Sequence, residues 1–273
     1  MLAENLSLDQ RMREAEIILL DTVSINRTAL YRDNPELSAA DKALFFERIN
    51  RRAAGEPIQY ILGEVEFMSL RIKVGPGVLI PRPESECWLE NLILWWQNNR
   101  GKSPGLILDL CTGSGCLALA LAQHFAGLSV IGLDKSKEAL EFARYNAGLN
   151  RISNVVFVRG DLLSAIRPGC GGIDLLVSNP PYVSASEFKS LDPEVNRWEP
   201  SEALVGGDDG LDFYRLIIPE AFGLLAPQGL LAFEVGSSQG FAVRKLMHES
   251  GITETRIYKD YAGLDRAVFG VKK

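Results

Sequence analysis

The first 54 residues carry apolar side chains at helical spacing, in two segments. A capping-box sequence at residues 7–10 predicts the start of one helix, and a second helix is predicted from residues 38–41 to Gly55. Their apolar positions are Met12, Ala15, Leu19 and Val23 in the first helix and Leu44, Phe45, Ile49 and Ala53 in the second. We therefore expect a small helical bundle. A cluster of arginines near its end is expected to form a solvated face rather than a docking patch: Arg48, Arg51 and Arg52.

The spacing of apolar residues changes from Pro57 onward. Apolar and polar residues alternate over residues 65–74, on both sides of Met68-Ser69, and this alternation predicts a β-hairpin. The proline-rich run at residues 81–86 is expected to be a hinge between domains, or else a capped loop before a helix over residues 88–98.

From Leu106 onward short apolar strands alternate with helices. Such alternation favours a parallel α/β sheet. The first strand, a glycine loop and an apolar helix occupy residues 106–125. Later strands are predicted at residues 130–133, 155–158, 173–177 and 230–235, and residues 253–258 and 267–271 could close the sheet.

Composition and charge narrow the functional classes. The chain is 47% hydrophobic and 23% charged, as in globular proteins in water. Its net charge is −6 and neither half is a basic module, so general nucleic-acid binding is disfavoured. We see neither a signal peptide nor a membrane span. With two histidines and no Cys-x-x-Cys pair, we expect a cytoplasmic protein without a zinc site and with reduced thiols at Cys87, Cys111, Cys116 and Cys170.

The most informative stretch follows the apolar strand at residues 173–177. There Asn179-Pro180-Pro181-Tyr182 turns the chain out of the sheet, because neither proline has a backbone N–H. The stiff loop lies at the carboxyl end of a strand, where open α/β sheets bind ligands. The side-chain carbonyl of Asn179, the carbonyl of Pro180 and the flat face of Tyr182 suit a planar –NH2 group. For the tetrapeptide alone, a proline-rich turn without function is the alternative.

A second candidate site is the glycine loop at residues 111–115, between a strand and a helix. Asp134 ends the next strand, 21 residues beyond Gly113, and could hold ribose hydroxyls. Asp161 could accept the exocyclic amine of adenine, and Asp109 could orient the loop. The sequence lacks the third glycine of the dinucleotide fingerprint, and it has no phosphate-binding loop of the form Gly-x-x-x-x-Gly-Lys-Ser/Thr. The loop therefore predicts a nucleoside site, with a plain turn or a dinucleotide oxidoreductase as alternatives.

In this order, the two motifs resemble those of S-adenosylmethionine-dependent methyltransferases that modify an –NH2 nitrogen. The Asn-Pro-Pro-Tyr form is shared by enzymes acting on adenine and on glutamine. Three further stretches, and the helical bundle joined by a hairpin, are similar to the peptide chain release factor glutamine methyltransferases, PrmC/HemK. These stretches are Pro81-Arg82-Pro83-Glu84-Ser85-Glu86, Glu199-Pro200-x-x-Ala203-Leu204 and Gly206-Gly207-x-Asp209-Gly210-Leu211-x-x-Tyr214-Arg215.

The resemblance implies an α/β, Rossmann-like methyltransferase fold. Its seven-stranded sheet would have an antiparallel strand near the carboxyl terminus, and a β-hairpin would join it to a small N-terminal helical bundle. Residues 1–56 would form the bundle and recognise the substrate, residues 57–83 would form the hairpin linker, and residues 84–273 would form the catalytic domain.

The resemblance also implies a reaction. S-adenosyl-L-methionine would be the cofactor, and its methyl group would go to the side-chain nitrogen of the glutamine in the Gly-Gly-Gln motif of class I release factors. Asn179, Pro180 and Tyr182 would be catalytic, and with Pro181 they would bind the substrate. The cofactor would contact Cys111, Thr112, Gly113, Ser114, Gly115, Asp134, Asp161, Leu162 and Asn179. Two of these depart from the family, which usually has glycine at Cys111 and in some relatives tryptophan at Leu162.

The expected partners are class I release factors, with no membrane and no direct nucleic-acid contact. The main alternative is an adenine amino-methyltransferase acting on DNA or RNA, which would need a basic groove and a way to reach or flip the base. A binding protein that has lost catalysis is a further alternative, and the presence of Asn179 and Asp134 argues against it.

Overall fold

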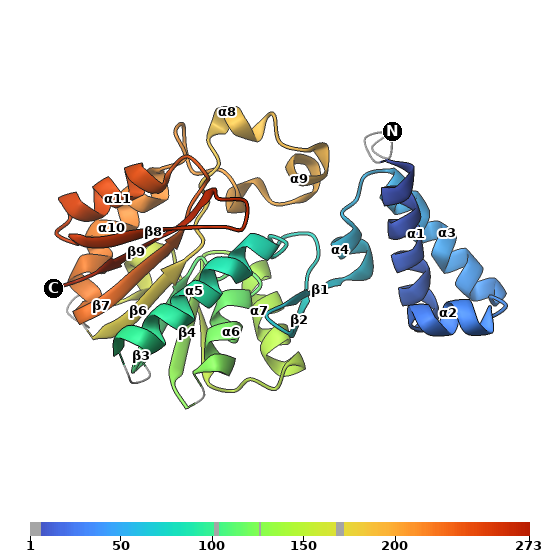
Figure 1. The fold of residues 1–273 in the computed structure, drawn as a ribbon, viewed down its shortest axis with the longest axis horizontal. Helices are drawn as coiled ribbons and strands as arrows, with labels where there is room; N and C mark the ends of the chain where they lie inside the picture. Colours follow the sequence, from blue (N-terminus) through green and yellow to red (C-terminus); the bar gives the residue numbers. More distant parts are fainter. Residues whose placement is uncertain (1–6, 101–103, 126, 168–171) are drawn as a thin grey trace.

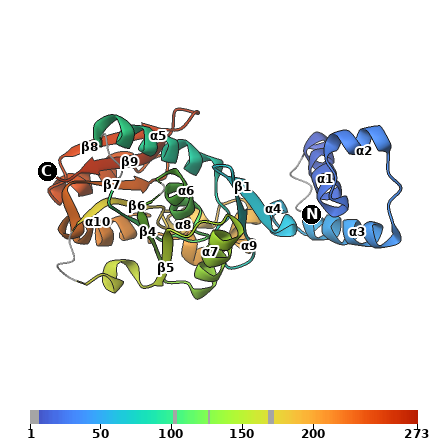
Figure 2. The ribbon, with the colours of Figure 1, turned by 90° about the horizontal axis from the view of Figure 1, so that it is seen from below.

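The computed structural model describes residues 7–100, 104–125, 127–167 and 172–273. The N-terminal bundle has three helices, α1 (Leu8–Val23), α2 (Arg27–Asp33) and α3 (Ala39–Ala53). It lies to one side of the rest of the molecule (Figures 1 and 2). The predicted capping box is present at the start of α1, since the Ser7 hydroxyl accepts from the Gln10 amide and the Gln10 side chain accepts from the Ser7 amide. Helix α2 was not predicted as a separate element, because its seven residues are too few to repeat an apolar position over several turns.

The arginines of α3 form ion pairs within the molecule. Arg52 is 11% exposed and pairs with Glu14 of α1 at 2.7 Å, and with Glu194 beyond the bundle at 2.8 Å. Arg48, 16% exposed, pairs with Asp21 at 2.7 Å. The expected solvated face is therefore wrong for these two arginines, which tie α3 to α1 and the bundle to the main body.

A short linker joins the bundle to the main body: helix α4 (Ile58–Leu62), then strands β1 (Glu64–Phe67) and β2 (Leu70–Lys73). The two strands form the predicted antiparallel hairpin, and both residues of its turn, Met68 and Ser69, have positive φ. The Tyr60 hydroxyl of α4 donates to the carbonyl of Val78 at 2.6 Å and fixes the linker to the chain that follows it.

The main body contains a seven-stranded sheet in the order β5-β4-β3-β6-β7-β9-β8. Its strands are β3 (Leu106–Leu110), β4 (Ser129–Asp134), β5 (Val155–Arg159), β6 (Ile173–Ser178), β7 (Leu225–Glu234), β8 (Glu254–Lys259) and β9 (Asp265–Val271). The first five strands in this order, from β5 to β7, run parallel to one another. Strand β9 runs antiparallel to both of its neighbours, β7 and β8. The sheet expected from the family resemblance is confirmed, although β7 begins five residues before the predicted start at residue 230.

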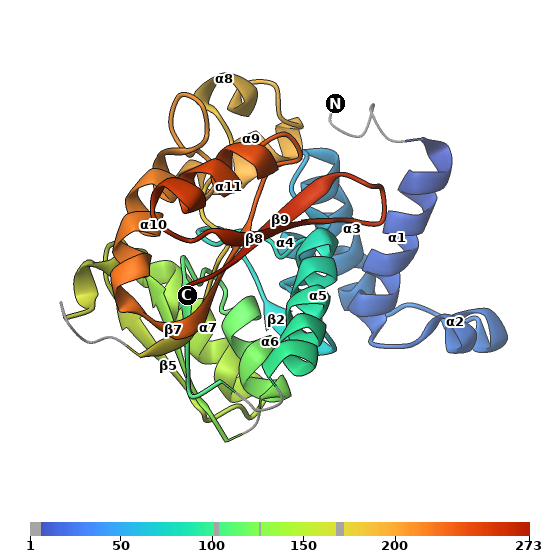
Figure 3. The same ribbon diagram turned by 60° about the vertical axis from the view of Figure 1, so that its left-hand side comes forward.

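Helices cover both faces of the sheet (Figure 3). One face packs against α5 (Pro83–Arg100), α6 (Cys116–His124) and α7 (Lys137–Leu149), and the other against α10 (Asp212–Leu224) and α11 (Gly240–Glu249). Successive strand residues alternate between the two cores: Ile107 belongs to the first, and Leu108 to the second. Both faces are apolar because both are buried, which is why the strands are continuous apolar runs.

The run at residues 81–86 is not the expected hinge or loop. Helix α5 begins at Pro83, where proline is tolerated because the first helical N–H has no partner within the helix. Arg82 forms an ion pair with Glu199, a carboxylate that is 5% exposed and also accepts from the backbone of Ile80 at 3.0 Å. These two contacts, at Ile80 and Arg82, anchor the chain on both sides of Pro81, just before α5 begins.

Cys87, Cys111 and Cys116 are free thiols, and Cys170 lies outside the described residues. Burial raises the pKa of Cys116 to about 12. Among the helices of the described residues, none combines the length and apolarity needed to cross a membrane.

Candidate active site

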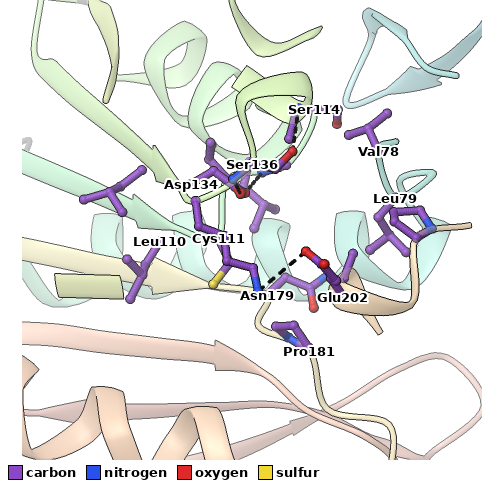
Figure 4. Close-up of a pocket in the computed structure, with 18 of the residues that line it drawn as sticks. Val78, Leu79, Leu110, Cys111, Ser114, Asp134, Ser136, Asn179, Pro181 and Glu202 are labelled. Atoms are coloured by element: carbon purple, nitrogen blue, oxygen red, sulfur yellow. Dashed lines mark hydrogen bonds and ion pairs between the residues drawn. The ribbon is translucent and has the colours of Figure 1, made fainter. Parts of the chain in front are cut away.

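A pocket opens at the carboxyl ends of β3, β4, β5 and β6, with a volume of about 1020 Å³ that includes its mouth open to solvent. The chain runs from β3 to β4 and β5 on one side and returns to β6 on the other, so the pocket lies at the point where the strand order reverses. Leu110, Asp134 and Asn179 mark the strand ends in this pocket, and Val78 and Leu79 face them from the segment after the hairpin (Figure 4).

The glycine loop forms one wall of the pocket. Gly113 has φ +56°, and a Cβ added there would meet no atom within 4 Å, so the backbone of the loop is open to a ligand. Gly115 has φ +81° and packs closely: a Cβ there would lie 3.1 Å from both Ala143 and Phe157. Cys111 also adopts a left-handed conformation, with φ +60°. This conformation is why glycine suits the position, and why cysteine there carries backbone strain.

Asp134 lies beside the glycine loop at the end of β4. Its carboxylate accepts from the amide of Gly113 at 2.9 Å and from the amide of Ser136 at 2.9 Å. Burial raises the pKa of Asp134, and the hydrogen bonds oppose this shift. The carboxylate is therefore fixed in orientation at the pocket wall, in the position predicted for an acceptor of ribose hydroxyls.

Asp109 is fully buried beneath the loop. One carboxylate oxygen accepts from the Thr112 hydroxyl and from the Ala118 amide at 3.1 Å, so Asp109 ties the loop to the start of α6. Its other oxygen has no partner in the described structure. Burial raises the pKa of Asp109 to about 7. The expected orienting role agrees with these contacts.

Asp161 and Leu162 follow β5 and line the far side of the pocket. Asp161 is exposed, and Leu162 adopts a left-handed backbone with φ +48° at the start of the 3-10 helix η2 (Leu162–Ala165). The pocket thus brings together all the residues predicted to contact the cofactor: Cys111, Thr112, Gly113, Ser114, Asp134, Asp161, Leu162 and Asn179 line it, and Gly115 lies directly behind.

The Asn179-Pro180-Pro181-Tyr182 loop leaves β6 at the same end of the sheet. Asn179 and Pro181 line the pocket, whereas Pro180 is buried and Tyr182 is turned away from it. In the described part of the chain, the Asn179 side chain makes no hydrogen bond, and no backbone N–H donates to the Pro180 carbonyl. The side-chain oxygen of Asn179 and the carbonyl of Pro180 thus have no hydrogen-bond donor among the described residues, and of these two residues only Asn179 lines the pocket.

A smaller cavity of about 290 Å³ adjoins the first one. Asn179 lines both, so it stands between them. The smaller cavity is also lined by Tyr182, Arg82 and Glu234. The Tyr182 hydroxyl donates to Glu234 at 3.3 Å, and burial raises the pKa of Tyr182.

The Gly206-to-Arg215 stretch packs behind the loop. The amide of Val183 donates to the carbonyl of Leu204, and the amide of Gly206 donates to the carbonyl of Val183, at 2.8 Å and 2.9 Å. A Cβ at Gly206 would lie 2.4 Å from the carbonyl oxygen of Pro181. Glycine is required here by the close approach of two backbones.

Several residues of the site were not predicted. Val78, Leu79, Ser136 and Phe213 contribute to the pocket wall, and Lys135 pairs with Glu202 at 3.8 Å to connect two of its sides. Lys135 and Ser136 directly follow Asp134, and this adjacency was the available signal. No local sequence signal connects Glu202 or Phe213 with the glycine loop.

Comparison with known proteins agrees with this geometry. The family model described as "PrmC N-terminal domain" matches residues 2–63, and "Methyltransferase small domain" matches residues 92–192. The structure is similar to a methyltransferase from Pyrococcus furiosus, with a TM-score of 0.55 and 20% identity over 86% of this chain and 99% of that chain. This likeness supports the methyltransferase fold.

Two curated relatives carry the name release factor glutamine methyltransferase. The protein from Thermodesulfovibrio yellowstonii is 41% identical over 94% of this chain and 91% of its own length. The protein from Chlamydia trachomatis is 41% identical over 94% of this chain and 86% of its own length. With this identity over almost its whole length, the chain belongs to the release factor glutamine methyltransferase family.

Proposed function

We propose that this protein transfers a methyl group from S-adenosyl-L-methionine to the side-chain nitrogen of the glutamine in the Gly-Gly-Gln motif of class I peptide chain release factors. The observation that carries the proposal is the position of Asn179 between the large pocket and the smaller cavity, with its side chain free to accept a hydrogen bond. A glutamine entering the smaller cavity would meet the contents of the large pocket at this residue.

The residues of the large pocket fit the cofactor. The open backbone at Gly113 admits a ligand close to the loop, and the fixed carboxylate of Asp134 is suited to ribose hydroxyls. Asp161 and Leu162 would contact adenine. When bound, S-adenosylmethionine supplies a methyl group already activated by its sulfonium, for an in-line displacement.

The difficulty of the reaction lies in the nucleophile, because an amide nitrogen shares its lone pair with the adjacent carbonyl. The side-chain oxygen of Asn179 and the carbonyl of Pro180 would accept the two amide hydrogens and so aim the nitrogen. Tyr182 would pack against the amide plane from the smaller cavity. Holding reactants in near-attack geometry can supply ~7–11 kcal/mol, so positioning is the main contribution of this chain. The displaced proton would leave to water after transfer.

We also propose that three consecutive parts of the chain have different roles. Residues 1–56 would bind the release factor, residues 57–83 would connect the two parts, and residues 84–273 would carry out the transfer. The bundle is suited to a protein partner because it lies beside the main body and exposes apolar side chains, among them Leu8, Met12 and Phe46. A role in translation termination would place the protein in the cytoplasm.

The proposal is tested by transfer of labelled methyl from S-adenosylmethionine. A class I release factor should be labelled, and a variant of it with alanine in place of the glutamine should not. DNA and RNA serve as competing substrates for the adenine alternative. Labelling of nucleic acid, or equal labelling of both release factor forms, would contradict the proposed substrate.

A further inference from the structure

Glu234 is the last residue of β7 and is 1% exposed. One of its carboxylate oxygens accepts from the Ser85 hydroxyl at 2.6 Å and from the Trp88 indole N–H at 2.7 Å. The other accepts from the Tyr182 hydroxyl at 3.3 Å. A single buried carboxylate therefore joins the start of α5 to the aromatic residue of the Asn-Pro-Pro-Tyr loop.

Gln239, in the turn after β7, holds the same tyrosine from its backbone. Its side-chain amide donates to the carbonyl of Tyr182 at 2.9 Å and, more distantly, to the carbonyl of Gly210 at 3.3 Å. Its side-chain oxygen accepts from the amide of Gly236 at 3.0 Å, which fixes which end of the side chain faces Tyr182. The sequence Glu234-x-Gly236-x-x-Gln239 thus holds Tyr182 at both its hydroxyl and its carbonyl.

The surrounding backbone packs closely against Tyr182 and the proline before it. A Cβ at Gly210 would lie 2.2 Å from the Tyr182 carbonyl oxygen and 2.5 Å from the Gln239 amide nitrogen. Gly206 makes an equally close approach to Pro181. The two prolines before Tyr182 fix φ at their own positions, so an orientation imposed at Tyr182 is passed back toward Asn179.

Stability alone is a weak reason for a carboxylate at this position. Burying a charge costs desolvation energy, and a well-packed apolar residue of similar volume often serves the fold as well or better. A carboxylate can instead orient its partners, since it accepts two hydrogen bonds from α5 and one from the loop after β6.

We propose that Glu234 and Gln239 are positioning residues for methyl transfer, which hold Tyr182, and with it the acceptors at Asn179 and Pro180, in the geometry that aims the glutamine nitrogen. The inference rests on the proposed function and names residues that support its acceptor loop. Because small displacements of a reacting group can lower the rate steeply, loss of either support should reduce kcat rather than cofactor affinity.

The test compares Glu234→Gln, Glu234→Ala, Gln239→Glu and Gln239→Ala with the wild type. The measurements are kcat and KM for the release factor, the Kd of S-adenosylhomocysteine, and the unfolding temperature. Glu234→Gln keeps an acceptor for Ser85 and Trp88, and Gln239→Glu keeps the acceptor for Gly236 but cannot donate to Tyr182. Asp174→Asn is the control, because Asp174 is also a β-strand carboxylate that accepts hydrogen bonds, in its case from the backbone amides of Gly105 and Leu106 at the opposite end of the sheet.

We expect kcat to fall on the order of tenfold in Glu234→Ala and in both Gln239 variants, the change that corresponds to one lost hydrogen bond involving a charged or buried group. Glu234→Gln should retain more activity than Glu234→Ala. The Kd of S-adenosylhomocysteine should stay close to the wild-type value, and Asp174→Asn should leave kcat unchanged.

A double-mutant cycle separates positioning from general stability, and it remains available if Glu234→Ala fails to fold. In the Tyr182→Phe background, Glu234→Gln should cause little further loss of kcat, because the bond through which it acts is already absent. Additive losses, or wild-type kcat in the folded single variants, would overturn the inference. A wild-type enzyme that leaves the release factor unmethylated would instead overturn the proposed function on which it rests.

Discussion

The side chain of Asn146 hydrogen-bonds both backbone groups of Lys73, accepting from its amide at 2.7 Å and donating to its carbonyl at 3.1 Å. Asn146 lies on α7 and is completely buried. It therefore takes the place of a neighbouring strand along the free edge of β2. The same amide nitrogen also donates to the carbonyl of Ser114 at 2.9 Å, which joins the linker hairpin directly to the glycine loop.

Asn146→Ala should lower the free energy of unfolding by about 2–4 kcal/mol, since three hydrogen bonds are lost and their backbone partners are half-buried at Lys73 and buried at Ser114. Asn150 is a natural control, because its side chain bonds Arg71 of the same strand in a more exposed position and does not reach the glycine loop. Denaturant unfolding of both alanine variants should show the larger loss for Asn146. Binding of S-adenosylhomocysteine should weaken only for Asn146→Ala; equal binding by both variants would argue against a link between hairpin and loop.

Asp134→Ala should weaken S-adenosylhomocysteine binding by about 1.5–3 kcal/mol, because the ribose hydroxyls would lose a charged acceptor. Since burial raises the pKa of Asp134, the carboxylate becomes protonated at a higher pH than an ordinary aspartate. Affinity in the wild type should thus decline as the pH is lowered into the range where this carboxyl group becomes protonated, which lies above that of an ordinary aspartate. Asp134→Ala should lack this decline. Calorimetric titration across that range checks both statements, and unchanged affinity in the variant would remove Asp134 from the site.

Asp109 should make stability depend on pH. Its pKa is raised from 3.8 to about 7, so in this interval the folded protein binds a proton that the unfolded chain has lost. The stabilising contribution of the protonated group is complete below 3.8 and is lost as the pH rises toward about 7. The slope is at most about 1.4 kcal/mol per pH unit for one proton.

Asp109→Asn isolates this effect, because the amide oxygen can still accept from Thr112 and Ala118. The free energy of unfolding of the wild type minus that of Asp109→Asn should fall with rising pH across the interval. A difference that does not vary with pH would mean that Asp109 titrates outside it.

Deletion of residues 1–55 should raise the KM for the intact release factor far more than it changes the Kd of S-adenosylhomocysteine. The deletion removes Arg52 and leaves Glu194 without this partner, so Glu194→Gln should be included to neutralise the remaining carboxylate. Steady-state kinetics on both deletion proteins provides the measurement. A KM equal to that of the full-length protein would show that the bundle does not recognise the substrate.

Asn179→Ala should reduce kcat by roughly 10²–10³-fold with cofactor binding nearly unchanged, by analogy with the removal of one preorganised polar group from an active site. Asn179→Asp keeps an acceptor of the same shape but replaces the amide donor with charge. If acceptance of the glutamine hydrogens is what matters, single-turnover rates should be higher for aspartate than for alanine. If the single-turnover rate of Asn179→Asp is no higher than that of Asn179→Ala, the essential group is the side-chain –NH2 of Asn179.

The sequence by itself determined the elements that bury a complete face and the turns that follow them. The strands at residues 106–110 and 173–177 were found because both faces of the sheet are covered, which leaves continuous apolar runs. The Gly113 loop and the Asn179 loop were found because glycine and proline constrain the backbone locally. The prediction that Asp134 belongs to the cofactor site followed from its place at the end of a strand. These signals all lie within a few residues of the feature they predict.

Only the tertiary structure decided what depends on contacts between distant residues. Helix α2 has only seven residues, which is too short for a periodic apolar signal, and its place in the bundle is set by the helices on either side of it. Glu199 approaches Arg82 from 117 residues away, and this contact helps anchor the start of a helix where a hinge was expected. Glu234 reaches Tyr182 across 52 residues, because β6 and β7 are neighbours in the sheet. Local patterns report how each residue is buried, whereas the partner that a buried polar group meets is set by the order in which the strands assemble.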